Sequence, residues 1–128
     1  MKVSAIKTAR QKARAGAWVK GIQLDELGIT IDVKARSLRN SEAVQLRGEL
    51  VRALPDEQKD NMPPDVAARI LAEMLAGAVV TDWSIEEPCT VDLLLDPEIG
   101  EFLRGACIYA GGQVAERGIA AFEADAKN

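Results

Sequence analysis

The sequence predicts a single domain of the mainly helical α+β class, with an N-terminal β-hairpin packed on three to four α-helices. Residues 29–36 alternate strictly between apolar and polar side chains, as a half-buried strand does. Later segments carry apolar side chains at intervals of three and four residues, as amphipathic helices do. A chain of 128 residues is long enough for one hydrophobic core, so we expect no second domain.

The β-hairpin is expected over residues 15–36. The segment AWVKG supplies its first strand, and residues 21–28 form the connection. The second strand places its apolar side chains on one face: Ile29, Ile31, Val33 and Ala35. Because two strands alone are marginally stable in water, we expect helices to cover this face.

The helical core, residues 40–110, is expected to begin with a helix over residues 41–54. Asn40 or Ser41 is suited to cap its N-terminus, and Pro55 ends it. The apolar stripe of this helix consists of Ala43, Leu46, Leu50 and Leu54. Its width is typical of a helix that packs on the core through one face.

A polar, proline-rich loop over residues 56–64 separates this helix from a central one. Pro64 is suited to the first turn of the central helix, and Trp83 closes it. A broad apolar stripe predicts burial on much of its circumference: Val66, Ala67, Ile70, Leu71, Met74, Leu75 and Ala78.

A leucine-rich turn and a last long helix complete the predicted core. Thr90 caps the turn, which holds the leucines at 93–95. Asp96 and Pro97 start the helix, because an aspartate cap and a proline in the first turn both favour a helix N-terminus. Glycines 111 and 112 are expected to weaken or end it, before a C-terminal helix or tail over residues 113–128.

The last long helix has two sides of different character. Five apolar residues are expected to face the core: Ile99, Phe102, Leu103, Ala106 and Ala110. The opposite side carries a row that we expect to bind a partner: Glu101, Gly105, Ile108 and Gly112. A mid-helix glycine costs about 1 kcal/mol relative to alanine, so Gly105 is explained if another helix approaches closely around Ile108. Alternatively, the helix bends or ends near Gly111, and Ile108 contacts the C-terminal segment of its own chain.

Charge divides the chain into a basic start and an acidic second half. Residues 1–20 hold six Lys or Arg and no acid, whereas residues 55–101 hold twelve Asp or Glu, and the whole chain carries a net charge of −4. We expect residues 1–14 to form a basic, partly disordered arm with at most a short helix over residues 8–15. Contact of this arm with the acidic half, of its own chain or of a neighbouring copy, is the alternative. The arm lacks interleaved aromatic residues and any groove-reading motif, so we expect no nucleic-acid partner.

The residue types favour a binding protein over an enzyme, and we expect no cofactor. The chain has no histidine, which removes the commonest general base near neutral pH. The cysteines, Cys89 and Cys107, have no zinc or redox spacing and are expected to be reduced, packed thiols. The acidic cluster matches no calcium-loop spacing and is interpreted as a solvated surface rather than a metal site: Asp82, Glu86, Glu87, Asp92 and Asp96.

A membrane location is not expected either. No uncharged stretch approaches the roughly 20 apolar residues that span a bilayer, and the N-terminus lacks the apolar stretch of a signal peptide. We therefore expect the protein to remain in a cytoplasm.

Two segments of the second half carry a family resemblance. LAGAVVTDW (residues 75–83) runs from an apolar helix into an Asp-Trp pair, and TVDLLLDPEIGEFLRGACIYA (residues 90–110) runs from a leucine-rich turn through Asp-Pro into a helix. AWVKG, ITIDVKARS and SLRNSEAVQLRGEL precede them in order. In this order and spacing, residues 15–110 resemble the tail assembly chaperones of long-tailed bacteriophages.

The resemblance implies a role in the tail morphogenesis of a phage or prophage. Such chaperones coat the tape measure protein, keep its long helices soluble, and recruit tail tube subunits before leaving. The implied partners are the tape measure protein and the tail tube protein, with a possible homo-oligomer, in the host cytoplasm and not in the mature virion. The alternatives are a structural tail or head-tail component and, more remotely, a carboxylate-based metal enzyme.

Five residues carry the family motif, and we interpret them as structural: Asn40, Asp82, Trp83, Asp96 and Pro97. A tryptophan beside a central helix usually fills a core volume, and a preceding aspartate pairs with a backbone N–H. Many family members have a longer glycine- and aspartate-rich turn after this tryptophan, where the present chain has only SIEEPC. Any partner contact made by that longer turn is therefore in doubt for this chain.

Overall fold

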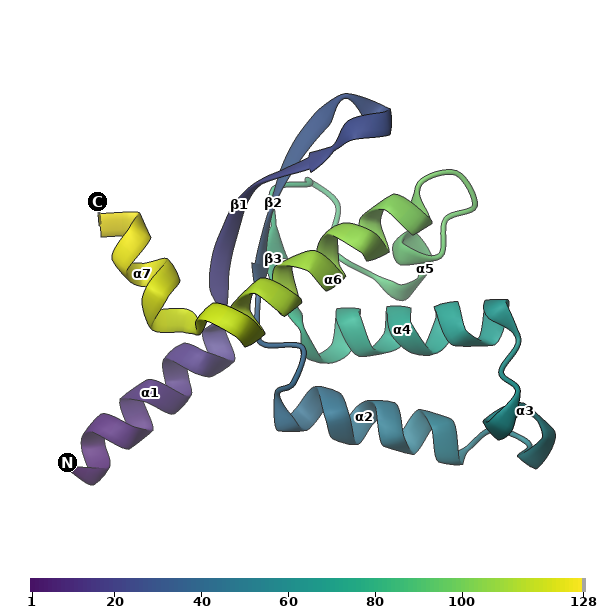
Figure 1. Ribbon diagram of the computed structural model, residues 1–128, viewed down its shortest axis with the longest axis horizontal. Helices are drawn as coiled ribbons and strands as arrows, with labels where there is room; N and C mark the ends of the chain where they lie inside the picture. Colours follow the sequence, from purple (N-terminus) through teal and green to yellow (C-terminus); the bar gives the residue numbers. More distant parts are fainter. Residues whose placement is uncertain (128) are drawn as a thin grey trace.

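A three-stranded antiparallel sheet in the order β1-β2-β3 organises the fold (Figure 1). The structure is a computed structural model that describes residues 1–127. β1 (Ala17–Leu24) and β2 (Ile29–Ala35) form the expected hairpin. β3 (Val80–Trp83) pairs with the other side of β2. Helices account for most of the remaining described residues, so the mainly helical α+β class with an N-terminal hairpin is confirmed.

The described residues form seven α-helices: α1 (Val3–Ala15), α2 (Ser41–Arg52), α3 (Asp56–Asp60), α4 (Pro64–Ala78), α5 (Val91–Leu94), α6 (Gly100–Arg117) and α7 (Ile119–Lys127). α6 packs across β1 and β2, while α4 contacts β3 and α6. α2 packs on α4, and α7 contacts α6 and β1. Figure 1 shows α1 projecting away from the rest of the molecule.

The hairpin buries one face, as its alternation predicts, apart from a bulge in β1 and the exposed start of β2. In β1 the register shifts between Val19 and Ile22, and Gly21 at φ +72° donates its N–H to Asp32 Oδ1 at 2.9 Å. This bulge keeps the apolar side chains on both sides of it buried. In β2, Ile29 was expected on the buried face and is exposed, since it follows the turn at the hairpin tip, beyond the covering helices.

The strand β3 lies where the sequence predicts the last turn of the central helix, so that expectation is wrong. α4 ends at Ala78, and the chain then extends beside β2. Val79 is fully buried, and its carbonyl accepts the N–H of Arg36 at 2.8 Å. The β-branched residues Val80 and Thr81 favour extended backbone. The free edge of β2 supplies their pairing partner, which the periodicity of the apolar residues does not indicate.

Two other boundaries differ from expectation. The predicted loop over residues 56–64 contains the short helix α3, which Asp56 and Glu57 favour by placing negative charge in its first turn. The basic arm is not disordered, because residues 3–15 form the helix α1. It is also longer than the expected segment, residues 8–15.

The long helix α6 begins later and ends later than expected. It starts at Gly100 rather than Pro97, and it passes through both Gly111 and Gly112 to Arg117. Gly118, at φ +80°, ends it instead. Glycines 111 and 112 do not break the helix, because Gly111 is a packing position rather than an end signal.

Close packing at Gly111 brings α6 against the sheet. A Cβ at this position would lie 2.8 Å from Leu38 Cγ and 3.0 Å from Val79 Cγ1. The Gly111 carbonyl also accepts the N–H of Leu38 at 3.1 Å. The buried residues of α6, most of them small, are Gly100, Leu103, Ala106, Cys107, Ala110, Gly111 and Val114. Of the residues expected to face the core, Ile99 is exposed, since it precedes the first turn of α6.

Trp83 is buried, as expected, and we predict that it anchors the β3 end of the core. Its exposed fraction is 6%, and its indole Nε1 donates to the Glu87 carbonyl at 2.7 Å. Trp83→Ala should therefore lower the free energy of unfolding by about 3 to 5 kcal/mol. Trp18→Ala is the control, because Trp18 is 36% exposed. Equal changes in thermal unfolding for the two variants would contradict this assignment.

A pair of glycine substitutions in α6 tests the close approach. Gly111→Ala should destabilise the protein by about 1 to 3 kcal/mol, because its methyl group would overlap Leu38 and Val79. Gly105→Ala should stabilise it by up to about 1 kcal/mol, since a Cβ at Gly105 has no atom within 4 Å. Urea unfolding measures both, and a Gly111→Ala variant as stable as the parent would show that α6 can move away from the sheet at no cost.

Candidate partner-binding site

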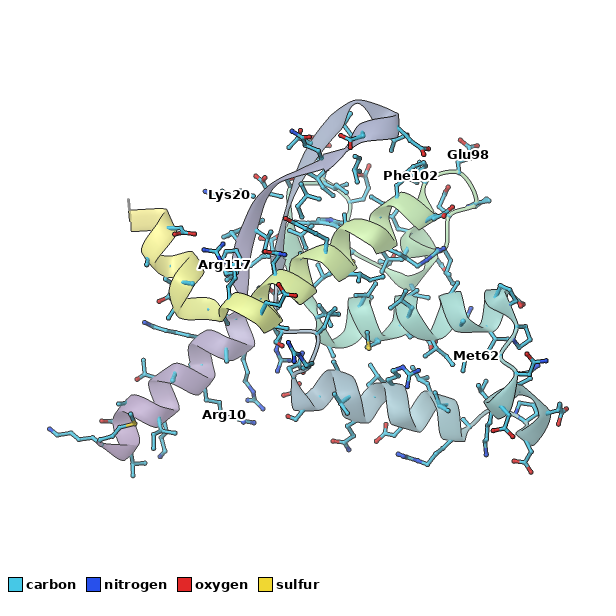
Figure 2. The ribbon with its side chains drawn as sticks, viewed as in Figure 1. Arg10, Lys20, Met62, Glu98, Phe102 and Arg117 are labelled. Atoms are coloured by element: carbon cyan, nitrogen blue, oxygen red, sulfur yellow. The ribbon has the colours of Figure 1, made fainter. Side chains whose placement is uncertain are left out.

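A groove runs between β1 with its turn and the first half of α6. We call it the β1–α6 groove; its cavity volume is about 710 Å³, and it is lined by Gly21, Ile22, Gln23, Leu24, Asp25, Glu26, Glu101, Phe102, Gly105, Ala106 and Tyr109. Figure 2 shows Phe102 on the side of α6 toward the hairpin. The groove exists because α6 crosses the sheet at an angle and its N-terminal half diverges from the hairpin tip (Figure 1).

Acidic groups border an apolar lining in this groove. Asp25, Glu26 and Glu101 are exposed, and no Lys or Arg is among the lining residues. The half-buried Phe102 and the exposed Tyr109 supply apolar surface between them, above buried side chains of β1. Such a site suits a segment with an apolar face and flanking positive charge, since burial supplies affinity and charge complementarity supplies orientation.

The four residues of the predicted row on α6 do not all lie in the groove. Glu101 and Gly105 line the groove, and the absence of a side chain at Gly105 leaves open space there. Ile108 is 37% exposed on the adjoining surface of the helix. Gly112 is half-buried, with Leu38 Cδ1 3.9 Å from where its Cβ would lie. A partner-binding role for these four residues stays a prediction, but only two of them share this cavity.

Tyr109 joins the groove to a second hollow of about 580 Å³. This hollow is lined by the start of β1, Lys34, α6 and α7, with Arg117 and Phe122 on its far side. The Arg117 guanidinium lies 4.4 Å from the centre of the Phe122 ring. Side chains from β1 and α6 therefore offer a continuous surface on both sides of Tyr109.

The lining residues contributed by β1 and Tyr109 were not expected to form a site. Ile22 and Leu24 follow a bulge, which shifts the alternation that would identify their face. Phe102 packs against the core, as expected, and its half-buried side chain also lines the groove. Tyr109, an aromatic residue on the helix that bears Gly105, is the signal in the sequence that could have extended the predicted row to this surface.

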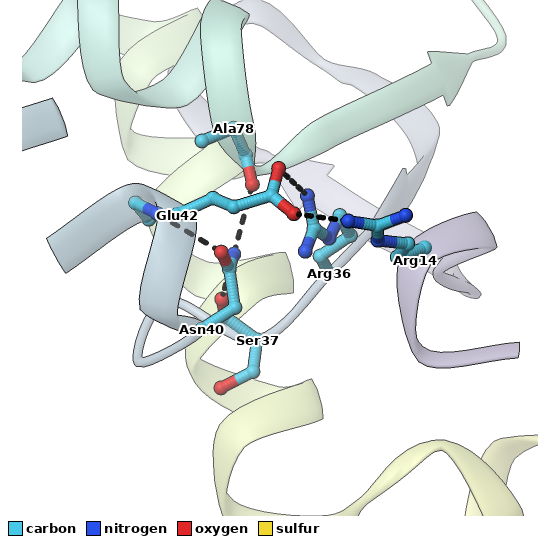
Figure 3. Close-up of polar contacts among 7 residues, drawn as sticks. Arg14, Arg36, Ser37, Asn40, Glu42 and Ala78 are labelled. Atoms are coloured by element: carbon cyan, nitrogen blue, oxygen red, sulfur yellow. Dashed lines mark hydrogen bonds and ion pairs between the residues drawn. The ribbon is translucent and has the colours of Figure 1, made fainter. Parts of the chain in front are cut away.

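Asn40, the first motif residue, holds together three elements (Figure 3). Its Oδ1 accepts the N–H of Ala43 at 2.9 Å, which caps α2 as expected. Its Nδ2 donates to the carbonyls of Ser37 at 2.7 Å and Ala78 at 2.8 Å. The side chain thus joins the end of β2, the start of α2 and the end of α4, and it has no free group for a partner in this arrangement.

Glu42 connects this junction to α1. Its carboxylate pairs with Arg36 at 3.1 Å and with Arg14, the α1 residue, at 3.3 Å (Figure 3). The hydrogen bond and charge of Arg36, followed by the charge of Arg14, hold the pKa of Glu42 below its usual value. The basic arm therefore contacts its own chain at this point, but through Glu42, which lies outside the acidic segment 55–101 that was the expected alternative partner.

The other motif residues fix turns. Asp82 is exposed on β3, and its Oδ1 lies 2.8 Å from the backbone N–H of Trp83. Asp96 accepts the N–H groups of Glu98 and Ile99 at 2.8 and 3.2 Å and so closes the turn that contains Pro97 and leads into α6. Each aspartate therefore has a structural partner within the fold.

The two cysteines are free and lie beside one another. The buried Cys107 thiol donates a hydrogen bond toward Cys89, which lowers the pKa of Cys89 and raises that of Cys107; burial raises the latter further. Cys89 is therefore the thiol that ionises more readily.

The described residues contain no group of three or more Cys, Asp or Glu side chains placed to hold a metal ion. Over the same residues, none of the helices combines the length and the apolar character required to cross a membrane. No family model, curated protein or solved structure matches the chain.

The ion pairs of Glu42 predict a pH dependence. Because its pKa is lowered by folding, Glu42 stabilises the folded state above the usual carboxyl pKa, and this contribution is lost as the pH falls through the lowered value. Arg36→Met should raise the pKa of Glu42 measured by carbon NMR. Arg14→Met should raise it less, because Arg36 is the larger cause. The opposite order would show that Glu42 depends mainly on α1.

Proposed function

We propose that the protein is a tail assembly chaperone of a long-tailed bacteriophage or prophage, which binds the tape measure protein and helps to recruit tail tube subunits during tail morphogenesis. The β1–α6 groove is the observation that carries this proposal. A chaperone for long helices needs apolar surface that a client helix can cover, together with charge that keeps the free protein soluble. The apolar lining and the acidic border at Asp25, Glu26 and Glu101 combine these properties.

The lining of the groove suits a helix as the client. An amphipathic helix enters an apolar groove through side chains one turn apart. Gly105 allows the backbone of a client helix to approach α6, since no side chain projects there. This also gives a reason for a glycine in the middle of an exposed helical surface, where alanine would favour the helix more.

The motif residues support the proposal because they hold the framework of the fold rather than line the groove. Asn40, Asp82 and Asp96 fix the chain at the start of α2, in β3 and before α6. Residues that resemble the family in order and spacing therefore hold the framework on which the groove is built. The groove itself is lined by other residues, as expected if relatives of one fold bind different tape measure sequences.

A groove-filling variant tests client binding. Gly105→Gln should reduce copurification of the cognate tape measure protein on coexpression by about tenfold or more, because its side chain occupies the open space. Its melting temperature should not fall, because glutamine favours a helix over glycine. Val44→Gln on α2 is the matched control, since Val44 is also an exposed helical residue remote from the groove. Equal copurification by all three proteins would rule out this groove as the client site.

Mass spectrometry of purified virions tests the other half of the proposal. A chaperone leaves before the tail is complete, so mature particles should lack the protein. Its presence at stoichiometric levels would instead identify a structural tail component.

A further inference from the structure

The helix α1 is uncovered along its whole length. Every residue of Val3–Ala15 is exposed, including Val3 at 67% and Ile6 at 56%. Isolated helices shorter than about 12 to 15 residues are marginal in water. The presence of an exposed apolar pair on a helix of this length calls for a surface that covers it.

Among the described residues, the hydrogen bonds and ion pairs that join α1 to the rest of the fold all lie at its C-terminal end. Thr81 Oγ1 donates to the Ala15 carbonyl at 2.8 Å, and Arg14 and Lys12 pair with Glu42 and Glu123. Gly16 then forms the corner between α1 and β1, where a glycine is required: its φ is +84°, and a Cβ would lie 2.7 Å from the carbonyl oxygen of Ala35. These contacts fix the direction in which α1 projects.

The N-terminal part of α1 combines positive charge with apolar surface. Residues 2–14 hold five Lys or Arg and no acid. Among the described side chains, Lys2, Lys7 and Arg10 form no ion pair. Spacings of three and four residues place Val3, Ile6 and Arg10 along one side of the helix. This is the pattern expected of a helix that enters an apolar groove with an acidic border.

The chain presents such a groove, but its own α1 is directed away from it. α1 leaves from the start of β1, whereas the β1–α6 groove adjoins the other end of β1 and the hairpin turn (Figure 1). With α1 in this position, none of its residues lines the groove of its own chain. A second copy of the chain is not restricted to this position and can approach the groove.

We propose that α1 of a second copy docks in the β1–α6 groove, with Val3 and Ile6 against the apolar lining and Lys7 and Arg10 beside Glu26 and Glu101. The assignment of the groove as a helix site rests on the proposed function. The second copy occupies the site in the absence of a client and is displaced when the client helix binds. Self-association thereby covers the apolar surface of the free protein.

Reciprocal charge reversal tests the pairing in the full-length protein. One variant carries Lys7→Glu and Arg10→Glu, and the other carries Glu26→Lys and Glu101→Lys; all four side chains are exposed, so folding should be retained by circular dichroism. Light scattering should show the parent associating as its concentration rises. Each variant alone should associate about tenfold or more weakly, and an equal mixture of the two should regain association.

Three results would overturn the proposal: a parent that is monomeric up to millimolar concentration, variants that associate like the parent, or a mixture that fails to regain association. Raising the salt concentration should weaken association of the parent, since the pairs are exposed.

Client binding is measured separately, so that the two proposals can fail independently. The Lys7→Glu, Arg10→Glu variant should still bind the tape measure protein, and more tightly than the parent because no second copy competes. Client binding without any self-association would remove this inference and leave the chaperone function. Complementation between the variants without client binding by any of them would leave this inference and remove the chaperone function.

Discussion

The close approach of α6 to the sheet is the constraint on which the other features depend. Gly111 leaves no room for a side chain between α6, Leu38 and Val79, and its carbonyl accepts the N–H of Leu38. This contact joins α6 to the chain that leaves β2 and to the residue that precedes β3. From this point the N-terminal half of the helix extends past the second half of β1 and diverges from the hairpin tip (Figure 1). The groove is the space that remains between the two, and its width is set by a contact remote from it.

A polar junction around Asn40 fixes the positions of further elements. Asn40 satisfies backbone groups of three different segments, which fixes the positions of α2 and α4 relative to β2. Glu42, in the first turn of α2, extends the junction to Arg14 of α1. Exposed ion pairs of this kind contribute little stability individually. Their role here is directional, because together with the corner at Gly16 they determine where the basic helix points.

The sequence predicts well those features that depend on local periodicity and capping. The strand at β2, the Asn40 cap, the Thr90 cap and the burial of Trp83 all follow from residues within a few positions of one another. The features it misses depend on contacts between distant segments. β3 forms because β2 offers a free edge, and Gly111 is tolerated within α6 because Leu38 lies against it. Neither neighbour can be found from the local pattern of apolar residues.

The candidate site shows the same division. Glu101 and Gly105 were identified because an exposed mid-helix glycine is unfavourable unless something requires it. The opposite wall of the groove comes from β1, more than 75 residues earlier in the chain, and a bulge shifts the register that would reveal its apolar face. Sequence periodicity can therefore identify a helix surface that needs a partner, but the shape of the site depends on how the sheet places its edge beside that helix.

Positive charge on α1 and negative charge at the groove affect both solubility and association. A net charge of −4 is modest for a chain that exposes an apolar groove and an apolar pair on α1. The positive charge on α1 attracts the negative charge at the groove, so the apolar surfaces beside these charges are brought together. Two α1 helices repel each other, and so do two grooves, because their charges have the same sign. Contacts between two grooves or between two α1 helices are thereby disfavoured, so charge selects which of the exposed apolar surfaces meet. Because these charges are exposed, their attraction is screened by salt, and a partner with a larger apolar face can replace the helix at the groove.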